Sequence, residues 1–192
     1  KKDQQRKNIP VSVKTRIGYS TPIVEDWIPI ILETKPTLIA LHGRTLKQQY
    51  SGKANWDEIK KAAELCHKND VLILGNGDIS DLDDAHNKIN QFDVDGILIG
   101  RASLGNPLFF TKDGAGTDNA KPSKSIFEIA LEHSYLFEKT YSSDPRYNFL
   151  PMRKHLGWYV KSFPGARDAR VELFKTNNPK EVEVVLKKYK LI

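Results

Sequence analysis

The chain has 192 residues, of which 39% are hydrophobic and 28% charged, and its formal net charge at pH 7 is +6. This composition predicts a folded protein of one or two domains and excludes a disordered polyelectrolyte. No apolar run approaches the roughly 20 residues that span a bilayer, and the single cysteine, Cys66, can form no intramolecular disulfide. We therefore expect a cytoplasmic protein in a reducing compartment, without a membrane segment.

The positive charge is concentrated in the second part of the chain. Residues 1–110 carry 15 Lys and Arg against 14 Asp and Glu, whereas residues 111–192 carry 15 against 10. An excess of cationic side chains favours binding to a polyanion. The C-terminal part is therefore the predicted binding region for a polyanion.

Apolar runs and helical patterns alternate along the first 100 residues. Strand-like runs occupy residues 9–15, 37–41, 71–74 and 95–99, and helix-like segments occupy residues 27–33, 56–67 and 80–89. This alternation indicates βα units around a parallel sheet. Because a complete (β/α)₈ TIM barrel needs about 250 residues, the sequence predicts an α/β fold: four βα units forming the C-terminal half of a TIM barrel. We expect the chain to be a C-terminal fragment of a longer protein.

A second domain is predicted after a linker. Residues 113–125 are rich in Gly, Pro and small polar residues, which is typical of a connection between domains. Beyond them, apolar residues have helical spacing, and Asn178 with Pro179 forms a good start for the last helix. The predicted organisation is a half barrel over residues 1–112, a linker over 113–125 and a small all-α helical bundle over 126–192.

Polar motifs follow each of the four predicted strands. Parallel strands bring their carboxyl ends to one edge, where TIM barrels build their active sites and often bind phosphate after strands 7 and 8. Each motif alone has a simpler interpretation: a surface lysine, a histidine bonded to a carbonyl, or an ordinary Asn-Gly turn. Together they predict a phosphate or flavin site, and its candidate residues are Lys14, His42, Asn76, Gly77, Asp78, Gly100 and Arg101.

Basic and aromatic residues are mixed in the tail. Arg153, Lys154 and Lys161 lie close in sequence to Trp158 and Tyr159. Cations bind phosphates and rings stack on unpaired bases, so this mixture favours RNA binding. The alternative is a solvated charged helix face with its aromatic residues in a core.

The ordered motifs of the chain resemble those of the tRNA-dihydrouridine synthases, and most closely the bacterial DusB-like branch. The resemblance extends over nearly the whole chain. It rests on residues 13–19, 41–45, 56–57, 75–79, 99–102, 105–107, 152–156 and 158–159.

This resemblance implies an enzyme that uses FMN, reduced by NADPH, to reduce the C5–C6 double bond of a uridine in tRNA. It implies that Lys14 contacts the isoalloxazine ring and that His42 supports the flavin. The phosphate would be held by Asn76, Gly77, Asp78, Gly100 and Arg101, and the candidate tRNA contacts are Arg16, Arg44, Arg153, Lys154 and Lys161.

The cysteine that acts as the acid in this family lies in the half that the chain lacks. We therefore expect no catalytic residue in this chain, an inactive fragment, no metal site and no obligate protein partner. Cys66 is interpreted as structural. Two alternatives stay open: an FMN-dependent barrel oxidoreductase acting on a small molecule, and a non-catalytic tRNA-binding remnant.

Overall fold

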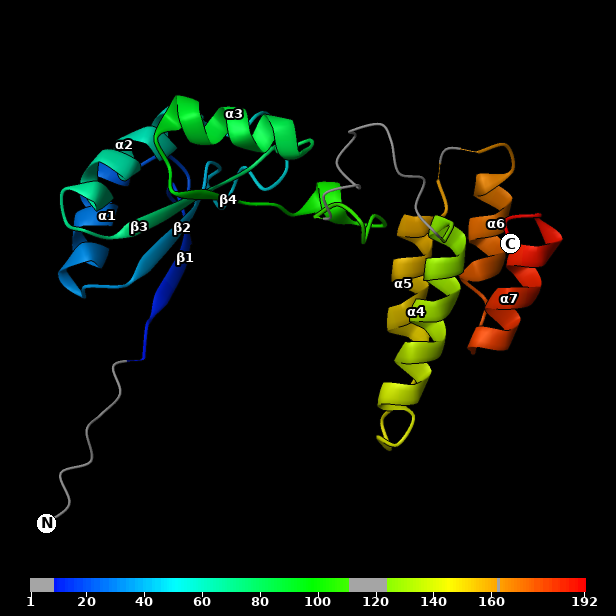
Figure 1. Ribbon diagram of the computed structural model, residues 1–192. Helices are drawn as coiled ribbons and strands as arrows, with labels where there is room; N and C mark the ends of the chain where they lie inside the picture. Colours follow the sequence, from blue (N-terminus) through cyan, green and yellow to red (C-terminus); the bar gives the residue numbers. More distant parts are fainter. Residues whose placement is uncertain (1–8, 111–123, 162) are drawn as a thin grey trace, which may run out of the picture. The chain divides into compact units, whose positions relative to one another are not determined.

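The computed structural model describes residues 9–110, 124–161 and 163–192. The chain divides into two compact units, Lys1–Gly100 and Arg101–Ile192 (Figure 1). This division falls before the predicted boundary at residue 112, because residues that follow the sheet pack with the helices of the second unit. The Leu104 carbonyl, for example, accepts a hydrogen bond of 3.3 Å from Lys161 Nζ. Most of the predicted linker lies outside the described residues.

The first unit is an α/β unit with a four-stranded sheet. All strands are parallel, and their spatial order β1-β2-β3-β4 is also their order in the chain. Its elements are β1 (Ser12–Arg16), α1 (Val24–Glu33), β2 (Leu38–His42), α2 (Trp56–His67), β3 (Leu72–Asn76), α3 (Leu82–Phe92) and β4 (Gly96–Leu98).

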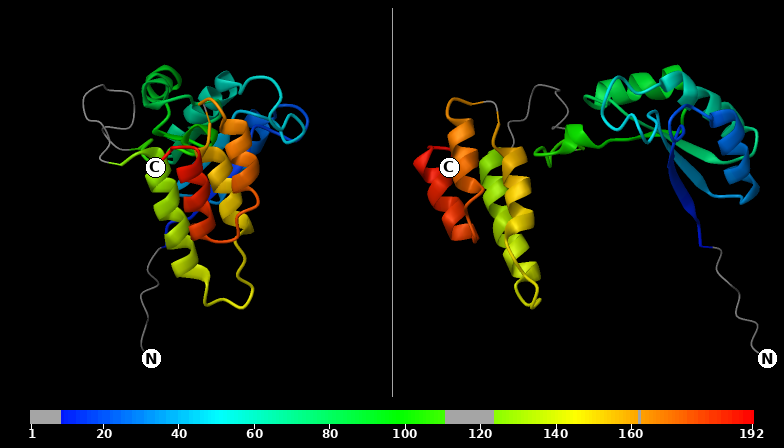
Figure 2. Two further views of the ribbon diagram at one scale, coloured as in Figure 1. Left: turned by 90° about the vertical axis from the view of Figure 1, so that its right-hand side faces the viewer. Right: turned by 180° about the vertical axis from the view of Figure 1, so that it is seen from behind.

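The three helices of this unit lie on the same face of the sheet (Figures 1 and 2). Ile39, Leu41 and Ile73 point from the strands into a core shared with Ile28 and Ile59, and all five are fully buried. A doubly wound sheet would have helices on both faces and a reversal in strand order. Sequential parallel strands with helices on one face instead fit a partial TIM barrel, as predicted.

The ends of the helices follow from local side chains. The Asn55 side chain accepts from the backbone N–H groups of Asp57 and Glu58 at the start of α2, and Asp81 accepts from that of Asp84 at the start of α3. Helix α1 begins at Val24, before the predicted start at residue 27, and contains Pro29 in its interior. The pattern-based boundaries were therefore displaced by a few residues wherever a cap or a proline was misjudged.

In its described residues, the second unit contains four α-helices after a short 3₁₀ helix over Arg101–Ser103. Helix α4 packs against α5 and α7, and α6 packs against the same two helices. Met152, Leu156, Leu173 and Leu186 are fully buried in their shared core. The helices are α4 (Ile126–Tyr141), α5 (Leu150–Tyr159), α6 (Ala166–Leu173) and α7 (Pro179–Lys188).

Side-chain caps also fix this unit. Ser125 and Glu128 form a reciprocal capping box at the start of α4. Asn178 accepts from the Glu181 backbone N–H at the start of α7, where Pro179 is the first residue, as the sequence predicts. In the described part of the chain, the helices are all too short or too polar to cross a membrane.

Candidate functional site

A row of polar side chains crosses the sheet where the strands end. Arg16 is in register with His42, and His42 with Asn76. Side chains alternate between the two faces of a strand, so this row lies opposite the face that carries the helices. Lys14 lies on the same face, because it precedes Arg16 by two residues in β1. The structure thus brings four predicted site residues to one edge of the sheet: Lys14, Arg16, His42 and Asn76.

Within this row, Asn76 is fixed by the last strand. Its Nδ2 donates a hydrogen bond of 2.6 Å to the Leu98 carbonyl, and its own carbonyl accepts from the Gly43 backbone N–H at 3.0 Å. The ends of β2, β3 and β4 are therefore tied together at the level of the predicted phosphate loop.

His42 is held in its neutral form. Partial burial is the main cause that lowers its pKa to about 4, followed by the positive charges of Arg16, Lys14 and Arg44, whereas Asp78 raises it. A neutral imidazole offers one N–H donor and one acceptor nitrogen. Together with the nearby cations, it forms a surface that suits an anionic ligand with polar groups.

The loop after β3 leaves room only for glycine at position 77. Gly77 has φ +131°, and a Cβ placed there would lie 2.6 Å from the Ala54 Cβ and 3.2 Å from His42 Cδ2. Its carbonyl accepts a hydrogen bond of 3.0 Å from Trp56 Nε1. A similar close approach occurs at Gly75, where a Cβ would lie 2.5 Å from the Trp56 ring. The start of α2 therefore packs directly onto the backbone of this loop.

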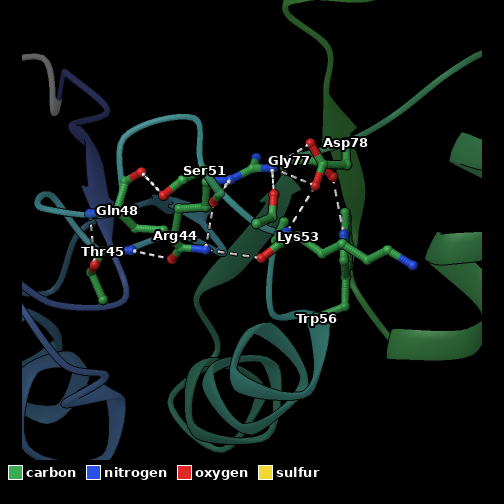
Figure 3. Close-up of polar contacts among 10 residues, drawn as sticks. Arg44, Thr45, Gln48, Ser51, Lys53, Trp56, Gly77 and Asp78 are labelled. Carbon is green, nitrogen blue, oxygen red and sulfur yellow. Dashed lines mark hydrogen bonds and ion pairs between the residues drawn. The ribbon is translucent and has the colours of Figure 1, made fainter.

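Arg44 is buried and forms an ion pair with the partly exposed Asp78, which links two loops (Figure 3). Arg44 is only 2% exposed, and its Nη2 donates to both Asp78 carboxylate oxygens at 2.8 and 2.7 Å and to the Gly52 carbonyl at 2.7 Å. Asp78 Oδ2 also accepts from the Ala54 backbone N–H at 2.8 Å. Arg44 is a candidate RNA contact by its sequence motif, but burial removes its guanidinium from the surface.

Gly100 and Arg101 stand where the two units join in the chain. Gly100 ends the first unit and Arg101 begins the second, and both residues are exposed. A Cβ placed at Gly100 would meet no atom within 4 Å. Unlike Gly77, this glycine is not required by its packing within the described chain.

The predicted RNA-binding residues of the tail have different surroundings. Arg153 is half-buried, and its guanidinium donates to the Thr176 carbonyl at 2.7 Å and to Asn177 Oδ1 at 2.6 Å. Lys154 and Lys161 are exposed. Arg153 thus holds the segment between α6 and α7, whereas the two lysines lie on the surface.

A cluster of rings between α4 and α5 was missed by the sequence analysis. His133 Nδ1 lies 3.1 Å from the buried Tyr159 hydroxyl, and the rings of His133 and His155 are 5.0 Å apart. The ring of His155 is also 5.0 Å from that of Trp158. Burial lowers the pKa of both histidines, and the proximity of His155 lowers that of His133 further. The spacing of His155, Trp158 and Tyr159 could have indicated that they lie close together on one helix. It could not have indicated that His133 of another helix packs against them.

Cys66 is fully buried in the core on α2. Burial is the main cause that raises the pKa of its thiol to about 11, and Asp95 adds to the shift. A thiol of this kind is a poor proton donor or nucleophile at neutral pH. The structure agrees with the structural role predicted from its position.

An open cavity of about 570 Å³ lies beside β1. Tyr19, Ile23, Trp27 and Leu46 give it a largely apolar lining, next to Lys14. The Trp27 indole donates a hydrogen bond of 3.1 Å to Thr15 Oγ1 at its wall. The cavity therefore adjoins the carboxyl end of β1, where Arg16 also lines it.

Fold and site together define a class: a sequential βα sheet with a row of cationic and polar side chains at the carboxyl ends of its strands. A model of the dihydrouridine synthase (Dus) family matches residues 2–191. The chain belongs to the dihydrouridine synthase family.

Curated relatives are similar over nearly the whole chain. A "Probable tRNA-dihydrouridine synthase" of Mycobacterium tuberculosis is 32% identical over 188 residues, which cover 93% of this chain and 47% of the relative. Proteins with the same name from Aquifex aeolicus and Staphylococcus epidermidis are 29% and 32% identical, covering 91% and 93% of this chain and 54% of each relative. The chain thus spans about half the length of these relatives.

Proposed function

We propose that the chain is part of a flavin-dependent tRNA-dihydrouridine synthase, which reduces the C5–C6 double bond of a uridine in tRNA with FMN as cofactor and NADPH as reductant. Family membership supports the activity. The observation that carries the site is the neutral His42 beside Asn76 and Gly77, with Lys14 and Arg16 adding positive charge at the same edge.

The residues of this edge fit FMN. Its phosphate needs N–H donors and positive charge, which the backbone around Asn76 and Gly77 and the Gly100–Arg101 pair would provide. Lys14 would offset negative charge on the isoalloxazine ring, and His42 would donate to a polar flavin edge. When bound, FMN would supply the hydride for the uracil ring. Arg44 neutralises the Asp78 carboxylate, so the loop presents less net negative charge to a phosphate.

Lys154, Lys161 and Arg16 are the proposed contacts to tRNA. Both lysines are exposed, and Lys161 also donates to the Leu104 carbonyl. Arg16 is half-buried at the site edge, where its Nη1 donates to the Thr45 carbonyl and its other nitrogen atoms stay available among the described residues. A base in folded tRNA must leave its stack to reach a flavin, which costs a few kcal/mol. Cationic contacts to the RNA backbone would help to supply that energy. For Arg153 we propose a supporting role instead, because its guanidinium is occupied by residues 176 and 177.

We further propose that activity requires polypeptide beyond this sequence. The uracil ring must be protonated by an acid near the flavin, and the buried Cys66, with its raised pKa, is unsuited to that task. The chain alone is therefore expected to be inactive.

The experiment that tests this function maps dihydrouridine, position by position, in tRNA from cells that lack the complete gene. Loss at a defined position supports the synthase and identifies its target. If dihydrouridine is retained at every position and the purified gene product carries flavin, the small-molecule oxidoreductase gains support. Retention without flavin would favour the tRNA-binding remnant.

Arg101 provides a direct test of the phosphate site. We expect Arg101→Ala to lower the FMN content of the purified complete gene product, because a guanidinium can bind phosphate through two hydrogen bonds. The flavin absorbance per protein measures the effect. Unchanged flavin content would remove Arg101 from the proposed site.

A further inference from the structure

The tie between Arg44 and Asp78 joins two loops that carry proposed site residues. Arg44 follows β2 and His42, whereas Asp78 follows β3 and Gly77, and the two residues are 34 positions apart in the chain. Arg44 also binds the segment 51–54. It donates to the Gly52 carbonyl and, at 3.4 Å, to the Ser51 carbonyl. One guanidinium therefore fixes three pieces of backbone (Figure 3).

Stability alone is a weak explanation for this arrangement. Arg44 is buried, whereas the Asp78 side chain is 33% exposed. A pair that buries one charge and leaves the other partly solvated contributes little net stability. Arg44 Nη1 is moreover buried without a hydrogen-bond partner in the part of the chain that the structure describes. Asp78 itself has φ +53°, a left-handed conformation that few non-glycine residues adopt. The Arg44–Asp78 ion pair therefore holds Asp78 in a backbone conformation that most residues avoid.

That geometry determines the surroundings of His42. Gly77 packs against the imidazole, and Trp56 holds the Gly77 carbonyl. We propose that Arg44 is a positioning residue: through Asp78 it holds the loop after β3 so that the Gly77 peptide lies against His42 and shields it from water. Resting on the proposed function, the same contact would set the phosphate-facing side of the FMN site.

Two conservative variants of the 192-residue chain test this inference. Arg44→Lys keeps the positive charge but replaces the planar guanidinium, whose Nε and Nη2 contact Ser51, Gly52 and Asp78, by one ammonium without that fixed geometry. Asp78→Asn tolerates the left-handed backbone but removes the negative charge. The readouts are the pKa of His42 by NMR titration and the exchange rate of the Trp56 indole N–H, which is bonded to Gly77.

The two variants separate positioning from simple electrostatics. The charged groups that act on His42 are Arg16, Lys14, Arg44 and Asp78. If only electrostatics acted, Asp78→Asn would lower the pKa of His42, because the Asp78 charge raises it. Arg44→Lys would then leave the pKa unchanged, because it keeps the positive charge. Loss of the loop position instead exposes the imidazole to water and raises its pKa.

We expect both variants to raise the pKa of His42 by at least one unit and to accelerate exchange of the Trp56 indole at least tenfold. Lys61→Gln is the matched control, because it removes an exposed ion pair with Glu58 on α2 of the same unit. It should change neither readout. If Arg44→Lys lowers the melting temperature but leaves the pKa of His42 and the indole exchange rate unchanged, Arg44 has only a structural role and the inference is wrong.

The inference is overturned if His42 keeps or lowers its pKa in Asp78→Asn and the indole stays protected in both variants. These measurements need no flavin, so they are independent of the proposed function. A separate FMN titration of the unsubstituted chain addresses the flavin role. If the chain binds FMN, Arg44→Lys should weaken binding about tenfold.

Discussion

His42 gives the α/β unit a defined response to acid. Its pKa is about 4 in the folded chain, against an ordinary value of 6.5, so the unfolded chain binds the proton more tightly. Stability is then unaffected above pH 6.5 and falls as the pH is lowered from 6.5 towards 4. Because the imidazole is partly solvated, we expect a loss of about 1–2 kcal/mol between pH 7.5 and 5.0.

Urea unfolding at the two pH values, followed through NMR signals of the first unit, measures this loss. His133 and His155 have the same sign of shift but belong to the second unit. His42→Asn should therefore reduce the acid dependence of the first unit alone. An equal dependence with and without His42 would contradict the prediction.

Gly77 and Gly100 make a matched pair for substitution. We expect Gly77→Ala to destabilise the first unit by about 1–3 kcal/mol, because the new methyl group meets Ala54 and His42 and the backbone has a positive φ. Gly100→Ala, which meets nothing, should change stability by less than about 0.5 kcal/mol. Urea unfolding of the two variants provides the comparison, and equal effects would show that the loop relaxes around a side chain.

Sequence patterns predicted individual site residues better than their partners. Lys14, His42 and Asn76 could be placed at one edge because the carboxyl ends of parallel strands must meet there. Their role in flavin binding stays a prediction. The partnership of Arg44 and Asp78 could not be predicted, since the residues are 34 positions apart and each resembles a ligand contact when considered alone.

At the scale of elements, the existence of helices and strands in the first unit was predictable and their ends were not. Hydrophobic periodicity determines which segment becomes a helix, but caps determine where it begins. Helix α3 begins at Leu82, after the Asp81 cap, and not at residue 80 as predicted. Strand β4 is limited to Gly96–Leu98, shorter than its apolar run. Its pairing ends at Leu98, which is in register with Asn76, the last residue of β3.

Helix α5 and the residues after it carry two of the proposed RNA contacts, Lys154 and Lys161. We expect Lys154→Ala and Lys161→Ala together to reduce the slope of log binding constant against log salt concentration for tRNA by about 1–2, if each lysine contacts a phosphate. Filter binding or fluorescence anisotropy across a salt series measures the slope. Lys139→Ala, an exposed lysine of α4 outside the proposed set, is the control.

Arg153→Ala should behave differently from the two lysines. Removal of its guanidinium leaves the Thr176 carbonyl without that donor, so the expected effect is a loss of about 1–2 kcal/mol of stability in the helical unit. The salt slope should stay unchanged. If Arg153→Ala instead reduces the salt dependence of tRNA binding and leaves stability unchanged, Arg153 is an RNA contact like the two lysines.

At the scale of the whole molecule, each unit has its own hydrophobic core. The amino-acid pattern predicted two regions and placed the boundary at residue 112, because the segment after it is rich in Gly, Pro and small polar residues. The compact units divide at Gly100 instead. The contact between Lys161 and Leu104 spans 57 positions, which no local pattern reveals.

The outer edge of β1 is the basis of a prediction for the chain as a whole. In the described sheet β1 pairs only with β2, and Ile9 and Val11 just before it are 80% and 61% exposed. Exposed edges of this kind promote pairing between chains. We expect concentration-dependent self-association, detected by light scattering, that Val11→Lys reduces severalfold. A monodisperse chain at all concentrations would show that the edge is protected.

The close packing of Trp56 on Gly75 restricts how this site can change by mutation. Any side chain at position 75 meets the indole ring, so Gly75 becomes replaceable only after Trp56 has become smaller. That earlier step removes the hydrogen bond to the Gly77 carbonyl and loosens the loop that faces His42. The order of substitutions therefore matters: libraries that vary position 75 alone should return only glycine, whereas paired libraries at positions 56 and 75 open an alternative route.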